Sequence, residues 1–231
     1  MTERMIRGRK DTALDIVVYI IMILFAVIFL YPLVFVLSNS ISASDAVLRR
    51  EVWLWPVGFS LESYRLVFSH QYVLHSYLNS FLYTGLGTAY SVALTILGAY
   101  PLSRRYLPFR DFFMLLIAFT MMFSGGLIPT YLLVRDLGLL NKVWAMVLPC
   151  AVTPFNLILL RTSMQEIPAA IEESAKIDGA GDFTILVRII LPMCFASVAT
   201  ITLLYVMAKW NDWFNAMIYL NDHSKYSLRL L

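Results

Sequence analysis

Five long apolar runs, separated by shorter polar segments, dominate the chain. They cover residues 16–38, 77–101, 112–132, 143–163 and 190–209. The first run has 23 residues, and a helix of that length, at about 1.5 Å per residue, can cross a hydrocarbon layer about 30 Å thick. Because lipid offers no partners to backbone donors and acceptors, each run is predicted to be helical. The pattern predicts one domain over residues 1–231, an all-α bundle of transmembrane helices.

Glycine and proline interrupt two of these runs. The third contains Ser124-Gly125-Gly126 and Pro129, and the fourth contains Pro149 and Pro154. Proline removes a backbone donor and clashes with the preceding turn, so kinks are expected at these positions. Broken helices often line transport pathways, but proline and glycine are also commoner in membrane helices than in soluble ones. Both interpretations stay open.

Small residues share one face of the second run. Gly85, Ala89 and Ala93 are spaced four apart, as residues on one side of a helix are. Such a face lets two helices approach closely in lipid, so close packing against another helix is predicted. A pore-lining strip is the alternative.

The composition excludes a soluble domain. The chain is 60% hydrophobic and only 14% charged, whereas soluble domains are about 45–50% apolar and carry more charge on their surface. The first apolar run follows a basic start, as in a signal peptide, but it exceeds the roughly 7–15 residues of a signal core and is predicted to remain as a span. The small net charge of +3 argues against a nucleic-acid partner.

Basic residues predict the orientation of the chain. The two densest clusters are Arg4, Arg7, Arg9 and Lys10 before the first run, and Arg104, Arg105 and Arg110 between the second and third. Lys and Arg concentrate in cytoplasmic loops. The N-terminus and the 164–189 segment are therefore both predicted to be cytoplasmic.

Residue types that carry metal or nucleotide chemistry are sparse. Cys150 and Cys194 form no CxxC pair, and His70, His75 and His223 lack the spacing of metal ligands on a helix. None of the ten glycines precedes a lysine, so the phosphate-binding GxxxxGK[ST] loop is absent. We expect no metal and no cofactor on this chain, and no ATP chemistry of its own.

The 164–189 segment is predicted to form two short helices. Pro168 suits the first turn of a helix, where its missing N–H costs nothing. Gly179 predicts the end of that helix, because glycine reaches the left-handed conformation cheaply, and a second helix is expected from about Gly181 to Ile190. The small residues Ser174 and Ala175 would let the first helix sit deep in a partner's cleft. An ordinary helical hairpin between two spans is the alternative.

A spaced pattern runs through the same segment: Glu173-Ser174-Ala175, three residues, Gly179, nine residues, then Ile189-Ile190-Leu191-Pro192. It resembles the signature loop of the membrane subunits of binding-protein-dependent ABC importers, with Ser174 standing where alanine is usual. The maltose-type branch, which imports sugars, is similar over residues 172–180. Further likeness to this branch, especially to members importing complex or plant-derived oligosaccharides, lies at 79–80, 99–104, 123–131 and 210–215.

The resemblance implies a fold, an activity and partners. The fold is that of a type I ABC importer permease with six core spans, so a sixth span is expected to be missing and the chain to be truncated at its C-terminal end. The chain would be a multi-pass subunit of a bacterial plasma membrane, forming half of a sugar pathway, and not an enzyme. Its partners would be a second permease, two cytoplasmic ATPase subunits that use ATP–Mg²⁺, an extracellular solute-binding protein and membrane lipid. The residues expected to couple it to the ATPase are Glu172, Glu173, Ser174, Ala175, Asp178, Gly179, Ile189, Leu191 and Pro192.

Four polar or aromatic residues are candidates for the substrate pathway: Asn79, Asn211, Asp212 and Trp213. Sugars bind amides, carboxylates and aromatic faces, although Trp213 would equally serve as an interfacial anchor. The alternative functions are a permease for a non-sugar solute, an ion-driven secondary transporter, and a membrane enzyme or scaffold. Ion-driven transporters tend to carry acidic residues inside the membrane, whereas the acidic residues here lie almost wholly in loops.

Overall fold

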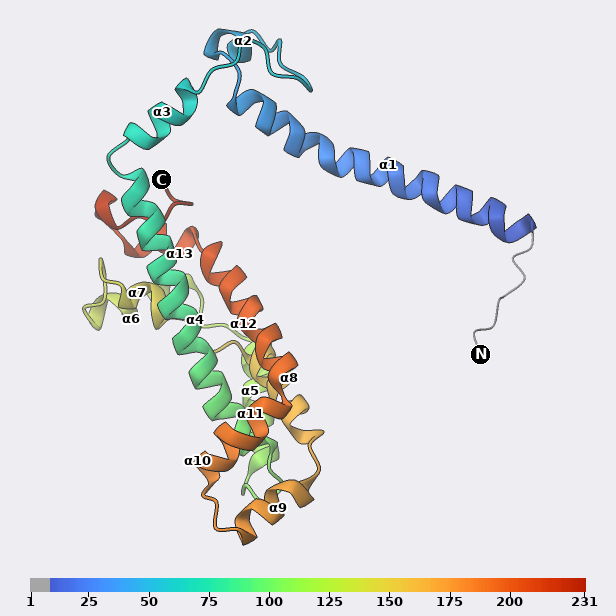
Figure 1. Cartoon of the computed structure of the whole chain (residues 1–231). Helices are drawn as coiled ribbons and strands as arrows, with labels where there is room; N and C mark the ends of the chain where they lie inside the picture. Colours follow the sequence, from blue (N-terminus) through green and yellow to red (C-terminus); the bar gives the residue numbers. More distant parts are fainter. Residues whose placement is uncertain (1–8) are drawn as a thin grey trace. The chain divides into compact units, whose positions relative to one another are not determined.

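The structure is a computed structural model that describes residues 9–231, with side chains from residue 14 on. Arg4, Arg7 and the side chains of Arg9 and Lys10, on which the predicted orientation partly rests, lie outside the described residues. The described residues form helices joined by turns, with one isolated β-bridge between Ser42 and Phe59. The chain divides into two compact units, Met1–Gln71 and Tyr72–Leu231 (Figure 1).

The first unit contains one long helix and a short connection. Helix α1 spans Arg9–Ser40, and the large apolar side chains from Leu14 to Leu37 are exposed. A helix that is apolar all round needs an apolar surrounding such as lipid. The shorter helices are α2 (Ser44–Leu48) and α3 (Glu62–Ser69). Ser42 fixes the connection after α1, because its buried hydroxyl accepts a hydrogen bond from the Val57 N–H at 3.1 Å.

The second unit is a helical bundle whose centre is formed by α4, α8 and α12 (Figure 1). Its α-helices are α4 (Val73–Ser103), α5 (Arg110–Met122), α6 (Leu127–Asp136), α7 (Trp144–Val147), α8 (Pro154–Gln165), α9 (Ala169–Ile177), α10 (Asp182–Ile185), α11 (Leu191–Met193), α12 (Phe195–Trp210) and α13 (Phe214–Tyr219). A π-helical turn over Leu186–Ile190 joins α10 to α11, and a 3₁₀ turn over His223–Lys225 follows α13. The centre of the bundle thus combines the second, fourth and fifth apolar runs.

Two helices in the described part of the chain are long and apolar enough to cross a membrane, Leu14–Ser40 within α1 and Val73–Ser103. They contain the predicted runs 16–38 and 77–101. The third run is broken into α5 and α6, which are bent by 110°. The break lies at the predicted glycines, where Gly126 has a φ of +88° that costs glycine little. Pro129 causes no second break, because it lies in the first turn of α6.

The fourth run, 143–163, is broken near Pro149 and Pro154, where kinks are predicted, whereas the bend in the fifth run, 190–209, is not predicted. Irregular backbone separates α7 from α8, and Thr153 before Pro154 is extended, with ψ of 128°, because proline disfavours a helical residue before it. The fifth run bends by 86° between Asp182–Met193 and α12. If each bent pair counts as one span, the described residues provide up to four spans.

The small-residue face of α4 does not pack inside this chain. Gly85, Ala89 and Ala93 are exposed, and no heavy atom of the described residues lies within 4 Å of a Cβ added at Gly85. The opposite face of α4 carries buried Ser and Thr side chains, and it packs against α12. Thr95 Oγ1 lies 2.8 Å from the Tyr205 hydroxyl across this contact. Small hydroxyl residues also permit close approach, so packing within the chain uses them instead.

Candidate functional site

The 164–189 segment folds as two helical pieces joined at glycine, as predicted. Helix α9 ends at Ile177, and Gly179 has a φ of +80°. The Gly179 N–H donates to the Lys176 carbonyl at 3.0 Å, and the Ala180 N–H donates to the Ala175 carbonyl at 2.9 Å. This pair of bonds is the Schellman motif that closes a helix with a left-handed residue. A second helical stretch, Asp182–Met193, follows, so the two helical pieces meet at a defined joint.

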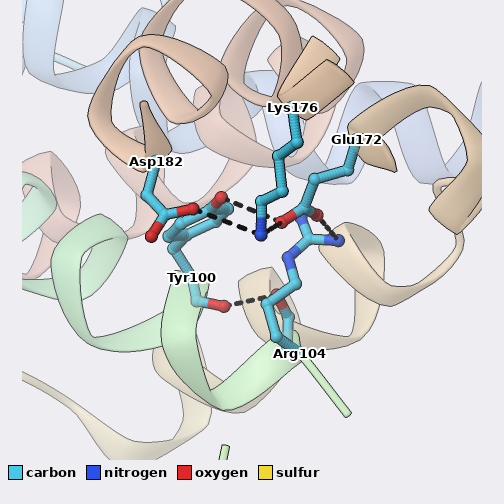
Figure 2. Close-up of polar contacts among 6 residues, drawn as sticks. Tyr100, Arg104, Glu172, Lys176 and Asp182 are labelled. Carbon is cyan, nitrogen blue, oxygen red and sulfur yellow. Dashed lines mark hydrogen bonds and ion pairs between the residues drawn. The ribbon is translucent and has the colours of Figure 1, made fainter. Parts of the chain in front are cut away.

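A buried ion pair ties α9 to the end of α4. Arg104 Nη1 lies 2.8 Å from Glu172 Oε2, and the two side chains are only 8% and 7% exposed. The Tyr100 hydroxyl also donates to Glu172 Oε1 at 3.2 Å, and the Arg104 guanidinium lies 4.9 Å from the centre of the Tyr100 ring. Figure 2 shows these side chains converging from the two elements. Glu172 therefore anchors α9 to the end of α4.

Lys176 joins the two helical pieces of the loop (Figure 2). Its Nζ lies 3.5 Å from Glu172 Oε1 on the same helix and 3.4 Å from Asp182 Oδ1 at the start of α10. The ammonium also lies 4.7 Å from the centre of the Tyr106 ring. Burial lowers the pKa of Lys176, but its hydrogen bond to Asp182 and the nearby acidic groups outweigh this, and the pKa lies above its usual value.

The inner face of the loop belongs to the largest apolar core of the chain. Ala175, Ile185 and Ile190 are buried there together with Leu160 and Met164 of α8. Ile189 and Leu191, two of the predicted coupling residues, are partly buried against the same core, whereas Pro192 is exposed. Ala175 is only 8% exposed, so its small size serves packing inside the chain and not the exposed tip to which the sequence assigned it.

The outer face of the loop is exposed and partly apolar. Glu173, Ser174, Asp178 and Gly179 are all exposed. Two large apolar side chains beside them face solvent: Ile177 is 86% exposed and Phe183 is 71% exposed. A rigid loop with a small, partly apolar outer face is a surface suited to contact with another protein.

The sequence-predicted pathway residues lie at the other end of α4 (Figure 1). The Asn79 amide donates to the carbonyls of Ser224 and Tyr226 at 2.8 and 3.2 Å. Asp212 accepts hydrogen bonds from the Asn215 N–H at 3.2 Å and from its amide at 2.9 Å. These groups hold the C-terminal segment and the start of α13, so their polar atoms already have partners within the chain.

Asn211 and Trp213 share the turn after α12 with Asp212. The Asn211 amide donates to the Met207 carbonyl at 2.8 Å, and its carbonyl oxygen accepts from Arg229. Trp213 is 45% exposed, with its ring 5.7 Å from that of Phe214. The structure brings these three residues together but places Asn79 on a different helix, and their role in a substrate pathway stays a prediction.

Sequence reasoning missed Tyr100 and Arg104 as part of the site. Both lie within the 99–104 stretch that carried the family likeness, and that likeness was the available signal, because no local pattern links them to Glu172. Among the described residues, no group of three His, Cys, Asp or Glu side chains could hold a metal ion. The site is an array of ion pairs and apolar contacts.

Comparisons with known proteins agree with this geometry. Residues 1–216 match the family described as binding-protein-dependent transport system inner membrane component. The polygalacturonan/rhamnogalacturonan transport system permease protein YtcP of Bacillus subtilis (strain 168) is 43% identical over 222 residues, which are 96% of this chain and 78% of that protein. Protein LplC of the same organism is 40% identical over 87% of this chain and 68% of its own length.

A solved structure shows the same fold. A chain in the crystal structure of a bacterial ABC transporter involved in the import of the acidic polysaccharide alginate superimposes with a TM-score of 0.92 and 37% identity. The match covers 96% of this chain and 80% of that one. It confirms the all-α permease fold, and the family match confirms that the chain is a transport subunit and not an enzyme. The chain belongs to the family of binding-protein-dependent transport system inner membrane components.

Proposed function

We propose that the chain is the permease subunit of an ATP-driven importer for a sugar or oligosaccharide, and that its 164–189 loop receives the motion of a cytoplasmic ATPase. The substrate class is supported by the polysaccharides that the names of two relatives carry. The chain forms half of the translocation pathway, and a second, homologous permease forms the other half. An extracellular binding protein delivers the substrate, and two ATPase subunits bind ATP–Mg²⁺.

The observation that carries the coupling role is the contrast between the two faces of the loop. Its inner face is fixed to α4 by the buried ion pair of Arg104 and Glu172. Its outer face presents Ile177 and Phe183 to solvent. A force applied to the outer face therefore moves the end of α4 with it, because breaking a buried ion pair costs about 3–5 kcal/mol.

The coupling residues divide into two groups in this proposal. Glu173, Ser174, Asp178 and Gly179 belong to the contact surface, because they are exposed. Glu172, Ala175, Ile189 and Leu191 belong to the seat of the loop, because they are buried or partly buried. Pro192 lies at the start of α11, where the loop continues toward the span. The π-helical turn Leu186–Ile190 directly precedes it, and such turns often occur at functional sites.

The substitution Ile177→Asp tests the contact surface. Burial of a large apolar side chain contributes about 1.5–3 kcal/mol, so we expect an affinity for the ATPase subunit lower by roughly 10- to 100-fold and a loss of uptake. Leu48→Asp is the matched control, because Leu48 is 84% exposed but lies on α2. Co-purification of the ATPase from membranes measures the affinity, and transport of labelled oligosaccharide measures the uptake. Unchanged ATPase binding by Ile177→Asp would count against the docking role.

Thiol labelling tests the orientation. A Ser174→Cys variant that lacks Cys150 is treated with a membrane-impermeant thiol reagent in intact cells and in inverted vesicles. We expect labelling only in inverted vesicles, because the positive-inside rule puts this loop in the cytoplasm. Labelling in intact cells places the loop on the outer side and refutes the ATPase contact.

A further inference from the structure

A large cavity lies beside the seat of the loop, between the α4–α5 turn, α8 and α9. Its volume is about 1080 Å³, and Arg104, Arg105, Arg110, Arg161 and Lys176 line it. Three carboxylates, Glu166, Glu172 and Glu173, also line it. Cations therefore outnumber anions around this space, and a bound anion would be attracted to it.

Several of the cations keep donors free. Arg104 uses Nη1 on Glu172, but its Nε and Nη2 are buried and have no hydrogen-bond partner among the described residues. Arg161 gives one donor, Nε, to the Leu102 carbonyl at 3.2 Å. Arg105 makes no ion pair with any side chain from residue 14 on. A buried charged donor without an acceptor is costly, and a phosphate group matches the fork of a guanidinium with two oxygens.

A second, separate groove lies along α8 and is mostly apolar. The groove has a volume of about 350 Å³ and is lined by Met121 of α5 and by Phe155, Ile158, Leu159, Thr162 and Ser163 of α8. Phe155, Ile158 and Thr162 follow the three- and four-residue spacing of one helix face. The same spacing leads to Gln165 and Glu166, which line the basic cavity. One face of α8 thus leads from the apolar groove toward the basic cavity.

We propose that this surface binds an anionic phospholipid, with its phosphate on Arg104, Arg105 and Arg161 and an acyl chain in the groove along α8. Basic pockets between membrane helices at the cytoplasmic surface recognise lipid headgroups. The groove favours a lipid over free phosphate, because a free anion would leave the apolar surface uncovered. The placement of this lipid in the inner leaflet rests on the proposed function, whereas the binding surface itself does not. The negative charge of the headgroup stabilises the seat of the loop by offsetting the excess of cations around the cavity.

The test uses the assembled transporter, purified in detergent and depleted of lipid. Native mass spectrometry follows the binding of phosphatidylglycerol and of phosphatidylcholine to the wild type, to Arg105→Gln, and to Arg105→Gln/Arg161→Gln. A basic residue near the membrane surface contributes about 1 kcal/mol, so we expect phosphatidylglycerol binding to weaken about 5-fold in the single variant and roughly 30-fold in the double variant. Arg135→Gln removes an exposed charge that is paired with Asp136 on α6, and it should leave binding unchanged.

Two further arms identify the ligand. Thr162→Trp fills the groove without a change of charge and should weaken lipid binding, whereas millimolar inorganic phosphate should not displace the lipid. Full displacement by phosphate overturns the proposal in favour of a free-anion site, and equal binding of the two lipids overturns it because the headgroup's net charge is then not recognised. Lipid binding that is seen only after the ATPase has been removed also overturns it, because the ATPase then covers the cavity in the assembled transporter. ATPase co-purification is measured in every sample, so a wild type that keeps its ATPase but binds no phosphatidylglycerol refutes this inference alone.

Discussion

Replacing Glu172 by methionine removes the carboxylate that pairs with Arg104 and accepts from Tyr100, while keeping a side chain of similar length. The pair spans 2.8 Å between Nη1 and Oε2, and both side chains are more than nine-tenths buried. Loss of one partner leaves the other charge buried and unpaired. The loop over 164–189 should then leave its seat on α4 more often, although the apolar contacts of Ala175, Ile185 and Ile190 still hold it.

The size of the effect follows from the surroundings of Arg104. Removing one member of a buried ion pair costs about 3–5 kcal/mol. Arg104 also lines the open cavity beside the loop, where water can reach the freed guanidinium, so we expect the lower end, about 3 kcal/mol. This cost corresponds to a roughly 100-fold increase in the unseated fraction. Arg104→Met should cost less, because Glu172 keeps the Tyr100 hydroxyl and Lys176. The double methionine variant should lie within about 1 kcal/mol of the wild type.

Thiol labelling measures the seating directly. A cysteine at position 175 is buried when the loop is seated, and a cysteine at the exposed position 174 gives the reference rate in the same loop. Native Cys150 and Cys194 are replaced first. We expect the labelling rate at position 175, divided by the rate at position 174, to rise about 100-fold in Glu172→Met. In the variant with methionine at both 104 and 172, this ratio should return close to its wild-type value. A ratio unaffected by Glu172→Met, or a double variant that opens more than either single one, would refute the anchoring role.

Three further perturbations test other parts of the bundle. Gly179→Ala should destabilise the protein by about 1–2 kcal/mol, because the φ of +80° at Gly179 disfavours a residue with a Cβ. The control Gly85→Ala, in the middle of α4, should be neutral or stabilising by up to about 1 kcal/mol. Thermal unfolding of the two variants measures the difference. Asn79→Ala removes two hydrogen bonds to carbonyls of the C-terminal segment. The binding of this segment to α4 should weaken by about 1–2 kcal/mol, so proteases should cleave the segment faster. An unchanged cleavage rate contradicts this. Tyr205→Phe removes the hydroxyl shared by α4, α8 and α12 and should lower the free energy of unfolding by about 1–3 kcal/mol, whereas Tyr77→Phe should have little effect.

The sequence predicted the features that depend on neighbouring residues. Apolar run length predicted the long helices α1 and α4, because crossing lipid is a matter of length and composition. Gly179 predicted the end of α9, because positive φ is a property of the residue itself. Gly125-Gly126 predicted the break before α6 for the same reason. The spaced pattern from Glu173 to Pro192 predicted the family through resemblance, and the family match confirms it.

Tertiary structure decided which side chains meet. Tyr100 and Glu172 are 72 positions apart, and no local pattern in either segment shows that α9 docks on the end of α4. The same packing buries Ala175 and leaves Ile177 exposed, although both residues are apolar and lie on one short helix. It also turned the hydroxyl face of α4 inward and the Gly85 face outward, because the contact with α12 is made along the hydroxyl face. Local propensity fixes where helices begin, bend and end, whereas the partner of each face is fixed only when distant segments pack together.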